Sequence, residues 1–169
     1  MLKKVFLDYD FTTVLSADYT THTGSCIKHQ VHELTDNHKE YGGFPSTYKF
    51  DNTIIHQLWW TENDIDFIEL GRQLNMEVIT VSTILQPPGC TIPLHRDTFF
   101  AINQKYPDRA ELKVRANIYL EDYKIGQFIQ YQDGDKYTTC DHWKKGEGFL
   151  WDSEVLHLST NAGMEDKNT

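Results

Sequence analysis

The chain has 169 residues and a formal net charge of −9, which favours one domain with a hydrophobic core of its own. Its pI near 5.3 argues against a broad basic surface for nucleic acid. Three cysteines without close spacing (Cys26, Cys90 and Cys140) favour reduced thiols and a cytoplasmic location over disulfides or a zinc knuckle, and no apolar run approaches the length of a membrane span.

The first sixty residues are polar and irregular in pattern, with aromatic islands such as Trp59-Trp60. Thr61 then has the character of an N-cap, and acidic residues follow it in the next turn. Together with a partial apolar stripe, these features predict a helix over 62–74.

Beyond this helix the hydrophobic pattern changes to period two, with many β-branched residues, which is typical of strands. The predicted strands are 78–85, 92–97, 112–121, 126–132, 136–141 and 147–152, followed by one that carries His157. Many short strands after an N-terminal helix predict a mainly β fold with flanking helices, of jelly-roll type. We expect one domain over 1–169, with a flanking segment and helix in 1–75 and the core in 76–169.

The strongest chemical signal is His95-Arg96-Asp97 with His157 far downstream. Residues two apart on a strand point to the same side, so His95 and Asp97 would project together. A histidine from a distant strand would complete two imidazoles and one carboxylate, the ligand set of non-haem iron(II). The tripeptide alone is weak evidence. His157 between two leucines also fits an ordinary hydrogen-bonded histidine.

Apolar and polar residues alternate clearly along most of the predicted strand 112–121. Val114, Ala116, Ile118 and Leu120 form one face, and Arg115, Asn117 and Tyr119 form the other. If the polar face looks inward, Arg115 occupies a partly buried cavity and requires an anion. If it looks outward, Arg115 lies in solvent, as on many antiparallel sheets.

Four blocks of sequence, in order, resemble the 2-oxoglutarate/Fe(II)-dependent oxygenases, and among them the aspartyl/asparaginyl β-hydroxylase type. The blocks are Val81 to Ile84, Pro88 to His95, Leu112 to Leu120, and Trp143, Gly146, Asp152 and His157 at the family's spacing. The resemblance covers roughly 77–169.

The resemblance implies a double-stranded β-helix, the cupin-like jelly roll. It implies that His95, Asp97 and His157 bind Fe(II), although mammalian hydroxylases of this type lack a carboxylate at the position of Asp97. The 2-oxoglutarate contacts that it implies are Ser82, Arg115, Asn117 and Lys167. Lys167 stands ten residues past His157, where the family uses a basic residue for the far carboxylate.

The family runs on through another strand after the position of Thr169. The core is therefore expected either to lack a last strand or to close differently. A mobile terminal lysine is accordingly an open alternative for Lys167.

The implied activity is oxidative decarboxylation of 2-oxoglutarate, a small-molecule cosubstrate, coupled to hydroxylation of a peptide, a protein side chain or a small metabolite. The acidic charge disfavours a long polynucleotide, and no membrane partner is expected. Phe149 and Trp151 fit core residues better than pocket walls.

Three alternatives remain at this point. A cupin-like module could bind a metal or ligand without turnover. The segment Val5 to Thr12 resembles the D-x-D-x-T motif of haloacid-dehalogenase phosphatases, with Asp8 and Asp10 as the reactive carboxylates, but that chemistry needs a parallel α/β sheet. The simpler interpretation of this segment is a first strand followed by a polar turn. Four further histidines suggest zinc or, more simply, a solvated loop; they are His22, His29, His32 and His38.

Overall fold

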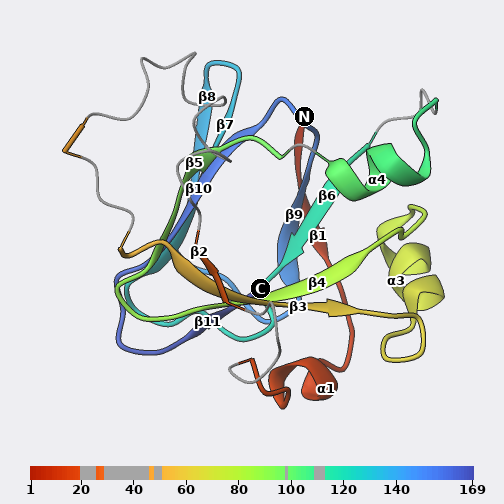
Figure 1. The fold of residues 1–169 in the computed structure, drawn as a ribbon, viewed down its shortest axis with the longest axis horizontal. Helices are drawn as coiled ribbons and strands as arrows, with labels where there is room; N and C mark the ends of the chain where they lie inside the picture. The colour runs from red at the N-terminus through yellow and green to blue at the C-terminus, as the bar shows by residue number, and fades with distance from the viewer. Residues whose placement is uncertain (20–25, 29–45, 48–50, 98, 109–112) are drawn as a thin grey trace.

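The computed structural model describes residues 1–19, 26–28, 46–47, 51–97, 99–108 and 113–169. Within these residues two layers of antiparallel strands face each other (Figure 1). One layer is a four-stranded sheet in the order β5, β10, β7, β8. Its strands are Thr91–His95, Leu156–Asn161, Gln127–Asp133 and Lys136–Cys140.

The opposite layer consists of two sheets. The order β1, β9, β6 comprises Leu2–Phe6, Glu147–Trp151 and Arg115–Ile118. The order β11, β4, β3, β2 comprises Lys167–Asn168, Val81–Gln86, Ile54–Trp60 and Cys26–Lys28. This arrangement confirms the predicted mainly β, double-stranded β-helix fold.

The short strand β11 links the two sheets of the second layer. Its residues pair with Gln86 and Leu85 of β4, and the amide of Leu120, just after β6, donates to the carbonyl of Asn168 at 3.2 Å. The side chain of Lys167 shares the face of Gln86, its register partner, and lies inside the barrel with 2% exposure.

The polar face of β6 looks into the barrel. Arg115 pairs in register with Trp151 and Asn117 with Phe149, so these side chains share one face. Gly148 opposes Ile118, where a Cβ would collide with the Asn117 carbonyl. This close approach requires glycine. The interior core is aromatic and consists of Tyr119, Ile129, Tyr131, Trp143, Phe149, Trp151 and Val155.

A second core fills the space between the outer face of the second layer and its covering segments. Its buried members are Leu7, Phe11, Val14, Ile65, Leu70 and Leu120. Helices α1 (Thr12–Leu15) and α3 (Phe67–Leu74) lie on this side (Figure 1), whereas α4 (Phe100–Lys105) follows β5. No helix in the described ranges is long and apolar enough to cross a membrane.

The predicted helix over 62–74 is wrong in its start. Asp66, not Thr61, is the N-cap, because its carboxylate accepts from the amide of Glu69. Thr61 instead donates its amide and hydroxyl to Asp64, which closes a separate turn.

The polar beginning of the chain also contains regular structure that the pattern did not reveal. Strands β1 and β3 lie in the segment expected to be irregular, and Trp59-Trp60 ends β3. The later strands fall where they were predicted, with ends that differ by a few residues. For example, β4 spans Val81–Gln86 rather than 78–85, and β6 spans Arg115–Ile118 rather than 112–121.

Candidate metal centre

The first layer brings the two predicted histidines side by side. His95 is the last residue of β5 and His157 is the second residue of β10, and the two are register partners. Their ring centroids are 4.2 Å apart. Asp97 follows β5 by two residues, so its carboxylate reaches the same point.

The three side chains converge. His157 Nε2 lies 3.7 Å from Asp97 Oδ2, and His95 Nε2 lies 4.0 Å from Asp97 Oδ1. One ligand atom of each residue lies within 4.8 Å of the other two, and this is the one such group of three found among the described residues. We call these three residues the triad.

Hydrogen bonds fix the orientation of both imidazoles. His95 Nδ1 lies 2.7 Å from the Pro93 carbonyl, and His157 Nδ1 lies 3.2 Å from the Val155 carbonyl. A carbonyl can only accept, so each Nδ1 carries the proton. Each Nε2 then keeps its lone pair toward the centre of the triad, as in histidine-ligated metal sites.

The site favours neutral imidazoles and a charged carboxylate. Burial, followed by the neighbouring His157, lowers the pKa of His95 to about 4, and burial also lowers the pKa of His157. Burial by itself would raise the pKa of Asp97, but Arg115 and the two histidines outweigh it, so this pKa lies below its ordinary value.

Asp97 has a donor on each oxygen. Arg115 Nη1 donates to Oδ1 at 2.9 Å, and the indole Nε1 of Trp151 donates to Oδ2 at 2.8 Å. Two neutral imidazoles and one carboxylate, with no fourth protein ligand found among the described residues, suit a divalent first-row metal with open coordination positions.

Three of the residues predicted to contact 2-oxoglutarate line one cavity with Asp97. This cavity has a volume of about 820 Å³ and reaches between β4 and β6. Ser82, Arg115 and Asn117 are these residues. Ser82 Oγ accepts from Gln57 Nε2 at 2.8 Å, and the buried Asn117 Nδ2 has no hydrogen-bond partner among the described residues.

Lys167 occupies the barrel interior instead. Its Nζ donates to Ser159 Oγ at 2.6 Å and to the Phe128 carbonyl at 2.9 Å. Ser159 is two residues past His157 on the same face of β10, so Lys167 lies deeper in the barrel than the triad. Burial lowers the pKa of Lys167 to about 7.

Two tyrosines of the barrel interior were not predicted as site residues. The hydroxyls of Tyr119 and Tyr131 are buried and make no hydrogen bond of good geometry with a described residue. Burial raises the pKa of both, so both are protonated. Tyr131 is the register partner of His157. Its place in an alternating strand was the only available sequence signal, and that signal does not identify the partner strand.

Trp151 was expected to be a core residue and is one, with 2% exposure. Sequence reasoning missed its bond to Asp97. Its register partner on β6 is Arg115, the other donor to that carboxylate.

The remaining candidates do not form a second site among the described residues. Strand β1, which precedes Asp8 and Asp10, pairs antiparallel with β9, whereas dehalogenase chemistry needs a parallel sheet. Asp10 Oδ1 accepts from the amide and hydroxyl of Thr12. His22, His29, His32 and His38 lie outside the described residues.

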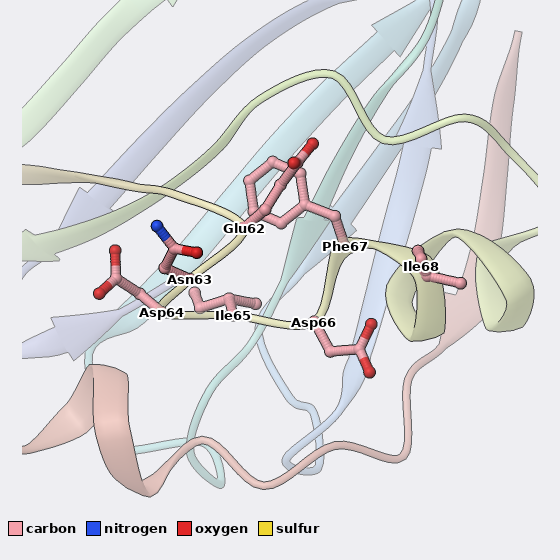
Figure 2. Close-up of a pocket in the computed structure, with 7 residues that line it drawn as sticks. All are labelled: Glu62, Asn63, Asp64, Ile65, Asp66, Phe67 and Ile68. Carbon is pink, nitrogen blue, oxygen red and sulfur yellow. The ribbon is translucent and has the colours of Figure 1, made fainter.

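A second hollow lies where α3 begins (Figure 2). Its two aspartates, Asp64 and Asp66, point in different directions, and each already accepts hydrogen bonds in a turn or cap. They therefore do not converge on a common point.

The fold is similar to that of a known hydroxylase. A crystal structure of a Pseudomonas putida prolyl-4-hydroxylase matches with a TM-score of 0.55 and 16% identity, over 99% of this chain and 88% of that chain. No protein-family model matches the chain, and neither does any curated protein sequence. At this identity the likeness is one of fold, and function has to be argued from the site.

Proposed function

We propose that the protein is an Fe(II)- and 2-oxoglutarate-dependent oxygenase that hydroxylates its substrate. The observation that carries this proposal is the convergence of His95, Asp97 and His157 inside a double-stranded β-helix. The fold shared with a prolyl-4-hydroxylase supports the same class of reaction.

The triad residues fit iron(II). Both imidazoles present an Nε2 lone pair, and Asp97 is charged. A carboxylate and two neutral imidazoles leave a +1 charge on the centre and several positions free for exogenous ligands. Iron(II), when bound, supplies the activation of dioxygen and the oxidation of 2-oxoglutarate. The aromatic side chains that line the barrel exclude water from the site.

The barrel interior offers a place for a dicarboxylate. Lys167 is a buried amine that is protonated below about pH 7. The buried hydroxyls of Tyr119 and Tyr131 lack a partner of good geometry among the described residues. A buried donor without an acceptor costs roughly 1–3 kcal/mol. A carboxylate beside Lys167 could accept from these groups, and we therefore assign the far end of 2-oxoglutarate to this part of the barrel interior.

At the other end of the cosubstrate, Arg115 is the cation beside the triad. Its side chain is 36% exposed, so it can pair with Asp97 or turn to a ligand carboxylate. Ser82 and Asn117 line the same cavity and supply a hydroxyl and an amide. We assign these three residues to the iron-proximal part of 2-oxoglutarate.

The prime substrate in this proposal is a peptide, a protein side chain or a small metabolite. The aspartyl/asparaginyl β-hydroxylase-like pattern of the sequence favours a protein side chain. The cavity beside Arg115 lies within the usual size range of small-molecule sites. The acidic charge of the chain favours a substrate that is not a polyanion.

The direct test measures succinate released from 2-oxoglutarate by the anaerobically reconstituted Fe(II) protein after oxygen is admitted. We expect release that depends on iron and is lost in His157→Ala. Iron bound at the triad with no succinate released would favour the non-catalytic cupin-like binder.

A further inference from the structure

The carboxylate of Asp97 is held from the opposite layer. His95 and His157 belong to the sheet of β5 and β10, whereas the two donors to Asp97 come from β6 and β9. Arg115 and Trp151 are register partners across these strands, and each takes one oxygen of the carboxylate. The loop after β5 is thereby tied to both layers at the triad.

The two donors differ in rigidity. The indole of Trp151 is 2% exposed and packs against Tyr131 and His157, with ring centroids 5.3 Å and 4.8 Å away. Arg115 is a long side chain at 36% exposure. Only the tryptophan is fixed in place by packing, and an indole N–H is a donor that needs an acceptor when buried.

We propose that Trp151 is a positioning residue for Asp97. Its N–H fixes Oδ2 and with it the plane of the carboxylate, so that the carboxylate stays directed toward the two Nε2 atoms of the triad. The positive charge of Arg115 stabilises the ionised carboxylate, and the hydrogen bond from Trp151 sets the direction in which the carboxylate points. This inference rests on the proposed binding of a metal at the triad.

The matched pair of variants is Trp151→Phe and Trp143→Phe. Both replace a buried indole of the same core cluster, but Trp143 stacks on Tyr119, with centroids 4.1 Å apart, rather than bonding Asp97. The probe is Co(II) added to the metal-free protein. Its visible absorption reports both affinity and ligand geometry, and unfolding curves in a chelator report stability.

We expect Trp151→Phe to weaken Co(II) binding by about 10- to 100-fold and to change the Co(II) spectrum. Trp143→Phe should lose stability but keep the affinity and the spectrum. Wild-type affinity and spectrum in Trp151→Phe would overturn the inference.

A second measurement does not depend on the folding of Trp151→Phe. In the metal-free wild type, the indole N–H proton of Trp151 should exchange with solvent at least about tenfold more slowly than in Asp97→Ala, since a hydrogen-bonded donor is protected. Equal exchange rates would overturn the inference.

The outcomes separate this inference from the proposed function. Cobalt binding that depends on Trp151, without succinate release by the iron form, sustains the positioning role and overturns the hydroxylase. Cobalt binding that is unchanged in Trp151→Phe, together with succinate release by the iron form, overturns the positioning role and sustains the hydroxylase. A wild-type protein that takes up no cobalt at the triad, judged against His157→Ala, overturns both.

Discussion

His95 and His157 are register partners on neighbouring strands, and their rings lie 4.2 Å apart. Backbone pairing of β5 with β10 therefore sets the spacing of the two imidazoles before any metal is present. Their Nδ1 atoms donate hydrogen bonds to the carbonyls of Pro93 and Val155. The two histidines are thus preorganised on strands, which hold ligands more precisely than loops do.

Removal of any one side chain of the triad should greatly weaken metal binding while the fold remains. His95→Ala, Asp97→Ala and His157→Ala should each lower Fe(II) or Co(II) affinity by at least about 100-fold, since one of three protein ligands is lost. Equilibrium dialysis measures the affinity, and far-UV circular dichroism checks the fold. His142→Ala, an exposed histidine, is the control. Full activity in Asp97→Ala would mean that only the histidines bind.

The sequence predicts those parts of the site whose residues lie close together along the chain. His95 and Asp97 lie two residues apart, so strand geometry alone joins them. Their meeting with His157, sixty residues away, was predicted only through a family resemblance. The bond from Trp151 to Asp97 depends on a strand from the opposite layer, and no local pattern encodes it.

The N-terminal strands were missed for a different physical reason. No residue of β1 is fully buried, and the two buried residues of β3, Ile55 and Leu58, lie three apart rather than two, so the apolar periodicity is weak. Strand β1 forms because it pairs with β9 over five residues. That is a tertiary effect, and it overrides local propensity.

Buried, uncharged histidines should make the metal-free protein sensitive to mild acid. The pKa of His95 is about 4 in the fold and ordinarily 6.5. Between these values the unfolded chain binds the extra proton, so the free energy of unfolding rises with pH across this window and falls as pH drops from 6.5 toward 4. A shift of this size corresponds to about 3 kcal/mol.

Urea unfolding in a chelator at pH 4.5, 5.5 and 6.5 measures this dependence. His95→Gln should make the slope shallower and leave the part due to His157, whereas His142→Gln should retain the wild-type slope. An equal slope in the wild type and His95→Gln would show that His95 is not buried as a neutral imidazole.

Loss of Arg115 should weaken 2-oxoglutarate binding more than it destabilises the fold. Arg115→Ala removes the cation beside Asp97 and, under the proposed function, a contact to 2-oxoglutarate. We expect the 2-oxoglutarate concentration for half-maximal succinate release to rise at least about tenfold, a charged hydrogen bond being worth about 1.5–3 kcal/mol. Arg72→Ala, which removes an exposed arginine of α3, is the control. An unchanged requirement in Arg115→Ala would remove this residue from the cosubstrate site.

The buried amine of Lys167 predicts a pH dependence of 2-oxoglutarate binding. Its pKa is about 7 in the free protein because burial disfavours the ammonium. A bound carboxylate favours the ammonium and raises that pKa, so binding takes up a proton above pH 7. The affinity should then fall by about tenfold per pH unit as pH rises above 7, until the pKa of the bound state is reached.

Calorimetric titration of the Mn(II) protein with 2-oxoglutarate, without oxygen, measures this affinity from pH 6.5 to 8.5. Lys167→Arg is the decisive variant, because a guanidinium stays protonated over this range and should give a flat profile. Lys124→Arg, at a partly exposed lysine paired with Glu121, should keep the wild-type slope. A wild-type affinity that does not change with pH would place the far carboxylate away from Lys167. The hydroxyls of Tyr119 and Tyr131, which make no hydrogen bond of good geometry within the described part of the chain, would then need another acceptor.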